Sequence, residues 1–117
     1  MHNFKQLQVW KKSMELVKSV YPLTEFFPKL EKFGLISQMQ RAVVSVPANI
    51  AEGSAKSSDK DFCRFLEIAT GSLFELETLV LLATDLNYLD TQVSEKIQTE
   101  INEIQKMIYG FKQKLIK

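Results

Sequence analysis

Histidine and cysteine are almost missing from this 117-residue sequence, which contains only His2 and Cys63. Zinc sites draw on several Cys and His ligands, and di-iron sites in helical bundles need paired Glu and His ligands, so no metal centre is expected. A Ser or Cys nucleophile normally needs a histidine base, and His2 precedes every predicted helix. A lone cysteine cannot form an internal disulfide, which favours a reducing cytoplasm. We therefore expect a cytoplasmic protein that is not an enzyme and uses no cofactor.

Glycine, proline and long apolar runs are also scarce. The four glycines form no phosphate-binding loop, and with only three prolines they leave little room for a turn-rich β fold. The longest apolar run, 79–83, is far shorter than the ~20 residues that cross a bilayer, and 1–10 lacks the apolar centre of a signal peptide. With 45% hydrophobic and 25% charged residues, the chain instead predicts one globular domain over 1–117, with no membrane partner.

Apolar residues recur at three- and four-residue steps in four segments, which is the period of amphipathic helices. The predicted helices cover approximately 6–27, 34–53, 58–88 and 91–116. No segment alternates with period two, and the predicted connections are short. The sequence therefore predicts an all-α protein, an antiparallel four-helix bundle with up-down-up-down topology.

Local signals mark the ends of these helices. Pro28 should stop the first helix, and Gly53 is expected as a left-handed terminator of the second. Ser57 and Ser58, with Asp59 and Asp61, mark the start of the third helix, and Asp90 or Thr91 is the expected cap of the fourth, because their oxygens can accept from free backbone amides.

The apolar surface exceeds what one bundle is expected to bury. Val9, Leu16 and Val20 lie on a second stripe of the first predicted helix, beside its main seam. Phe74 and Leu81 fall outside the main stripe of the third helix and form a flank of their own. Surplus apolar surface of this kind indicates an interaction site. We expect these five residues to form an interface between copies of the chain.

Polar residues form one notable constellation on the second helix. Ser45, Asn49 and Glu52 recur at three- and four-residue steps along one face. A hydrogen-bonded boundary between helices or subunits is the favoured interpretation, and a catalytic role is the alternative. We therefore add these three residues to the expected oligomer interface.

The net charge of +1 predicts no nucleic-acid partner, but its distribution is uneven. Residues 1–29 carry +3, 30–57 carry +1, 58–90 carry −5 and 91–117 carry +2. Two interpretations stay open: attraction between helices within the bundle, or a basic binding face.

Basic side chains on or near the first three helices are candidates for contact with phosphates. They are Lys11, Lys12, Lys18, Arg41, Lys56, Lys60 and Arg64. Lys112, Lys114 and Lys117 form a further basic group near the C-terminus. In a symmetric oligomer each group is repeated around an axis, which strengthens the local field.

The segment 37–53, SQMQRAVVSVPANIAEG, carries a family resemblance that continues through Asp61, Phe62, Phe65 and Leu66. It resembles the four-helix-bundle proteins encoded in intervening sequences of bacterial 23S ribosomal RNA genes, a group related to the accessory proteins of diversity-generating retroelements. The resemblance covers about the first 90 residues. It implies a ring-shaped homopentamer with a basic surface able to bind nucleic acid and, in retroelement members, a reverse transcriptase.

Two functional hypotheses follow. The first is an oligomeric RNA- or DNA-binding protein or ribonucleoprotein accessory factor that acts through the basic residues. The second is a protein-interaction scaffold that presents the oligomer to a partner such as a reverse transcriptase, without any role for nucleic acid. Salt-sensitive binding to nucleic acid separates the two.

Overall fold

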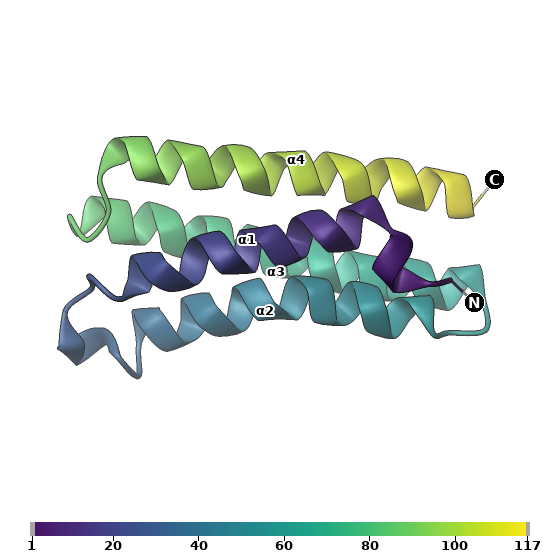
Figure 1. Ribbon diagram of the computed structural model, residues 1–117, viewed down its shortest axis with the longest axis horizontal. Coiled ribbons are helices and arrows are strands. Elements are labelled where there is room, and N and C mark those ends of the chain that lie inside the picture. Colours follow the sequence, from purple (N-terminus) through teal and green to yellow (C-terminus); the bar gives the residue numbers. More distant parts are fainter. Residues whose placement is uncertain (1, 117) are drawn as a thin grey trace.

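The computed structural model describes residues 2–116, and this part of the chain is all-α, without strands. Its helices are η1 (Phe4–Gln6), α1 (Gln8–Thr24), η2 (Lys29–Glu31), α2 (Leu35–Ser54), α3 (Asp59–Asp85) and α4 (Thr91–Leu115), where η marks a short 3-10 helix. Figure 1 shows the four α-helices lying side by side along the longest axis of a body that measures 45 × 24 × 20 Å. The predicted all-α class and the four helices are confirmed.

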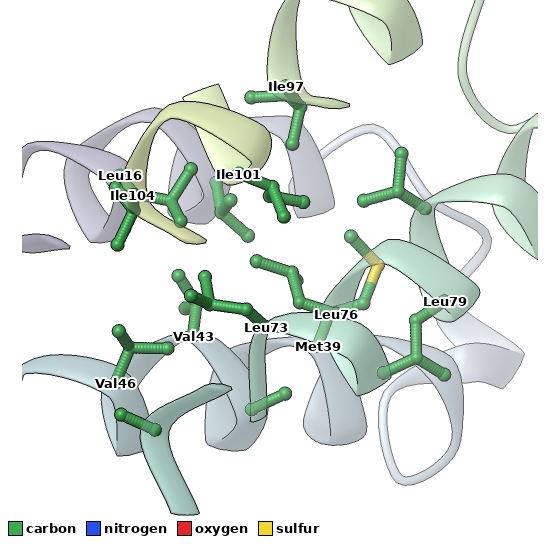
Figure 2. Packing of buried hydrophobic residues seen from close by; sticks show 14 of the residues in the cluster. Leu16, Met39, Val43, Val46, Leu73, Leu76, Leu79, Ile97, Ile101 and Ile104 are labelled. Atoms are coloured by element: carbon green, nitrogen blue, oxygen red, sulfur yellow. The ribbon is translucent and has the colours of Figure 1, made fainter. Parts of the chain in front are cut away.

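Each α-helix packs against two neighbours around one shared core. α2 lies between α1 and α3, and α4 lies beside α3 and α1 to complete the arrangement, so α1 and α3 are not adjacent helices. Figure 2 shows the centre of the core, where isoleucines of α4 meet leucines of α3 and valines of α2. Fully buried members include Val43, Leu73, Leu76, Ile101 and Ile104.

Two helices end earlier than the periodicity predicts. α1 stops at Thr24, two residues after Pro22, and α3 stops at Asp85 rather than at 88. At the latter end Asn87 takes a left-handed φ of 65°, and the amide of Tyr88 donates to the Ala83 carbonyl at 2.8 Å. This pair of features is a Schellman ending, which satisfies carbonyls at the helix terminus.

The expected start signals of α3 and α4 are confirmed, with Ser58 and Asp90 as the N-caps. The Ser58 hydroxyl accepts from the Asp61 amide at 3.1 Å, and the Asp90 carboxylate accepts from the Val93 amide at 2.8 Å. Both contacts satisfy amides that the helix itself leaves free.

The expected role of Gly53 as a left-handed terminator is wrong. Gly53 lies inside α2, is buried, and does not have a positive φ. A Cβ atom at this position would lie 2.7 Å from the Cβ of Phe65 and 2.9 Å from Cδ1 of Phe62. The glycine is therefore needed because α3 approaches the α2 backbone closely, which is a tertiary requirement.

We expect Gly53→Ala to lower the free energy of unfolding by about 1–3 kcal/mol, since the new methyl group meets the backbone-proximal Cβ of Phe65. Gly110→Ala is the matched control, because Gly110 lies inside α4 with nothing within 4 Å of its Cβ position. That change should raise stability by up to about 1 kcal/mol, the difference in helix propensity. Urea denaturation of both variants tests this, and stabilisation by Gly53→Ala would contradict the close-packing role.

Candidate nucleic-acid interface

The seven basic candidates lie in three places. Lys11, Lys12 and Lys18 are on α1, and Arg41 is on α2. The remaining three, Lys56, Lys60 and Arg64, surround the connection between α2 and α3. Because α1 and α3 are not adjacent helices, the structure does not bring all seven together in one chain.

The lysines on α1 differ in their partners. Lys12 Nζ lies 3.4 Å from a carboxylate oxygen of Glu103 on α4 and 3.9 Å from one of Glu15. Lys11 and Lys18 are exposed and form no ion pair with any described residue. They are seven residues apart, so they share one face of α1 at a spacing of roughly 10 Å. This outer face of α1 offers two unpaired cations to a ligand.

The cations around the α2–α3 connection are less available. Lys56 is half-buried, with its Nζ 4.9 Å from the ring centre of Phe65. Arg64 lies 3.9 Å from the Asp61 carboxylate, and Asp59 stands beside Lys60 in the chain. Neighbouring acids weaken the field that a phosphate meets, and although Glu15 stands between Lys11 and Lys18 on α1, α1 is net positive while α3 is net negative, so this group is a poorer candidate than α1.

The helices also differ in total charge. α3 carries six acids against two cations, whereas α1 carries three lysines and one glutamate. α4 has four lysines and three glutamates. Ion pairs Lys12–Glu103 and Lys112–Glu67 link α4 to both neighbours, but the acidic α3 and the basic α1 are not adjacent helices. Lys117, a member of the C-terminal basic group, lies outside the described residues.

Arg41 lines an open hollow of about 460 Å³ between α2 and α3. Its other lining residues are Gln38, Ala42, Ser45, Ser72 and Glu75. The Ser45 and Ser72 hydroxyls are 2.8 Å apart, and the Asn49 amide donates to the carbonyl of Ser45 at 2.8 Å and to its Oγ at 2.9 Å. Ser45 and Asn49 thus belong to a hydrogen-bonded boundary between two helices of the same chain, while Glu52 is exposed.

The prediction of an interface between copies is wrong for three residues. Val9, Leu16 and Val20 are 4%, 1% and 0% exposed, so they belong to the core of the single chain. The physical reason is that α1 contacts both α2 and α4, which cover its two apolar stripes from two sides. Phe74 and Leu81 remain 56% and 45% exposed and are still candidates for contact with another molecule.

Several of the exposed apolar residues that the sequence analysis missed lie near or on α3 and in the connection between α1 and α2. They are Ile68, Leu82 and Leu86 near or on α3, and Phe26, Leu30 and Phe33 in the connection. The run 79–83 contained a usable signal, because one helix face cannot hold five consecutive apolar residues. Leu86 follows the last residue of α3, where the helical period no longer predicts burial.

The described part of the chain contains neither a candidate metal site nor a candidate membrane-spanning helix. No group of three or more His, Cys, Asp or Glu side chains is placed to hold a metal ion there. None of the described helices combines the length and the apolar character needed to span a membrane.

Comparison with known proteins supports the resemblance that the sequence carries. Residues 5–110 match the family described as 23S rRNA-intervening sequence protein. The fold is similar to that of a protein of unknown function from the S23 ribosomal protein family of Bacteroides thetaiotaomicron, with a TM-score of 0.80 and 28% sequence identity. That similarity covers 89% of this chain and 97% of the other. No curated protein matches the chain.

Proposed function

Because the chain belongs to the family of 23S rRNA-intervening sequence proteins, we propose that it is a non-enzymatic accessory protein that binds RNA or DNA through α1. The observation that carries this proposal is the outer face of α1, where Lys11 and Lys18 are exposed and free of acidic partners among the described residues. Exposed lysines without ion-pair partners are suited to contact the phosphates of a nucleic-acid backbone. The protein acts in the cytoplasm without a cofactor.

Self-association belongs to the same proposal. In one chain the α1 lysines are few and the net charge is only +1, so binding by a monomer would be weak. Exposed Phe74 and Leu81 on α3 supply apolar surface for an assembly of up-down-up-down bundles. In a ring, such as the homopentamer that the family resemblance implies, the α1 face is repeated around the axis and its field is concentrated.

The double variant Lys11→Gln with Lys18→Gln tests the binding face. We expect its affinity for structured ribosomal RNA or duplex DNA to fall about tenfold or more at about 0.15 M ionic strength. The slope of log affinity against log salt should also decrease by about 0.7–0.9 for each phosphate contact that is lost. Filter retention or fluorescence anisotropy over a salt series gives both values.

Lys60→Gln with Arg64→Gln is the matched control, because it removes the same charge from the acidic α3. Its affinity should stay within about twofold of the unaltered protein, since those cations have acidic neighbours. An equal loss in both double variants would contradict a site on α1. Absence of salt-sensitive retention by the unaltered protein would leave the protein-interaction scaffold as the function.

A further inference from the structure

The connection between α1 and α2 displays large apolar side chains that nothing in the chain covers. Phe26, Leu30 and Phe33 are 84%, 81% and 88% exposed, the highest values among the large apolar residues described. Single exposed apolar residues are common, but three within eight positions form a patch that indicates an interaction site. With the two lysines between them they form what we call the connection surface: Phe26, Lys29, Leu30, Lys32 and Phe33.

The connection surface is held on a fixed support. Phe27 is 5% exposed, and its ring centre lies 5.4 Å from that of Tyr88 in the α3–α4 connection. The Tyr88 hydroxyl donates to one carboxylate oxygen of Glu31 at 3.1 Å, and the other oxygen accepts from the Leu35 amide at 3.2 Å. These contacts anchor the backbone while the exposed side chains point outward. A surface presented in this way loses little conformational freedom on binding.

The connection surface carries two cations, and the neighbouring acids Glu25 and Glu31 form an ion pair with neither of them. Lys29 and Lys32 form no ion pair with any described residue, and Lys32 Nζ lies 5.4 Å from the ring centre of Phe33. The Glu31 carboxylate keeps its negative charge, but it is held by hydrogen bonds from Tyr88 and the Leu35 amide and pairs with neither lysine. A complementary partner must therefore offer apolar contacts together with acidic groups.

The C-terminal end of α3 offers both apolar side chains and an acidic group. Leu81, Leu82 and Leu86 are 45%, 46% and 52% exposed, and exposed Asp85 stands among them. α3 is also the most acidic of the four helices. We call Leu81, Leu82, Asp85 and Leu86 the α3 end face.

Both surfaces lie at the same end of the bundle. The hydrogen bond between Tyr88 and Glu31 joins the two connections there, and Figure 1 shows them together at the left end. A rotation axis parallel to the helices keeps each residue at its own height, so it can bring the connection surface of one copy against the α3 end face of the next. This is the head-to-tail type of contact that closes rings.

We propose that the connection surface of one copy packs on the α3 end face of a second copy, with Phe26, Leu30 and Phe33 against the leucines and Lys29 or Lys32 beside Asp85. This proposal rests on the self-association proposed above and names the surfaces that form it. Single-stranded nucleic acid also stacks its bases on exposed phenylalanines. However, Asp85 and Asp90 at the same end repel phosphates, and Leu30 has no aromatic ring on which a base could stack. The second copy is the occupant that matches both the apolar and the charged side chains.

Two double variants test the contact, and in each the altered surface repels the unaltered surface on another copy of the same variant. Phe26→Asp with Phe33→Asp alters the connection surface, and Leu82→Lys with Asp85→Lys alters the α3 end face. All four positions are exposed, so each variant should keep its helical circular dichroism. By size-exclusion chromatography with light scattering, we expect each variant alone to have the mass of one chain. An equimolar mixture should regain at least twice that mass, because each mixed pair keeps one unaltered contact.

Ile116→Asp is the control, as Ile116 is 63% exposed and lies at the other end of α4. It should leave the assembly unchanged. If the unaltered protein is assembled and Phe26→Asp with Phe33→Asp has the same mass, this inference is overturned. The proposed self-association and RNA binding would remain intact. Unchanged mass with reduced RNA retention in that variant would instead assign the connection surface to nucleic acid, and would also overturn it.

Discussion

Phe62→Ala is expected to lower the free energy of unfolding by about 3–5 kcal/mol, the range for removing a buried aromatic ring. Phe62 is 1% exposed, and its ring centre lies 5.4 Å from that of Phe111 on α4 and 5.1 Å from that of His2. On its other side the ring reaches α2, where Cδ1 would be only 2.9 Å from a Cβ on Gly53. Phe62 therefore joins three elements at the end of the bundle where α2 and α3 connect.

The loss should be large because the cavity cannot close easily. α2 and α4 are fixed along their lengths by the core residues of α3, so they cannot move into the space of the missing ring. Urea denaturation monitored by circular dichroism measures the change. Phe74→Ala is the matched control on the same helix, and its 56% exposure predicts a cost within about 0.5 kcal/mol for the single chain. A similar loss in both variants would show that burial in one bundle does not set the cost.

The sequence predicted the helices and most of the core because both depend on local periodicity. In the third helix, Leu66, Leu73, Leu76 and Val80 recur at the spacing of one helix face, and all four are 0% exposed. Their spacing repeats the helical period, so they share one face whatever the neighbouring helix is. Ser58 acts similarly, since an N-cap depends on residues within one turn.

The apolar surface that another molecule covers was harder to predict. A second apolar stripe on a helix indicates a second neighbour, but the period is the same whether that neighbour belongs to the same chain or to another. On α1 the second neighbour is part of the same bundle, whereas the flank of α3 that carries Phe74 stays exposed. Phe33 was missed because a connection has no period from which to infer exposure, and Phe26 because the first helix was predicted to run to 27, whereas α1 ends at Thr24.

Tertiary contacts also decided which basic residues are available. Lys11 and Lys12 are adjacent in the sequence, yet only Lys12 meets Glu103 of α4. Lys56 resembles any other surface lysine in the sequence, but in the structure it covers the ring of Phe65. Partners distant in the sequence set these differences, so residue type and helix position alone predicted too broad a binding surface.

Leu16→Asp should unfold most of the chain, because it removes a core leucine and buries a carboxylate without a partner. Leu16 is 1% exposed and belongs to the same core cluster as Val43 and Ile104, as Figure 2 shows. The lost burial of a leucine costs about 2–5 kcal/mol, and an unpaired buried charge adds several more, which together approach the whole stability of a typical domain.

Leu81→Asp is the matched control, because it introduces the same carboxylate at an exposed position. At 45% exposure the new carboxylate stays in water, so this variant should keep its helical signal at 222 nm and lose only assembly mass by light scattering. Leu16→Asp should instead lose the helical signal itself. If Leu16→Asp were a folded single chain, the second stripe of α1 would have to be an assembly surface after all, and the assignment of Val9, Leu16 and Val20 to the core of one bundle would be wrong.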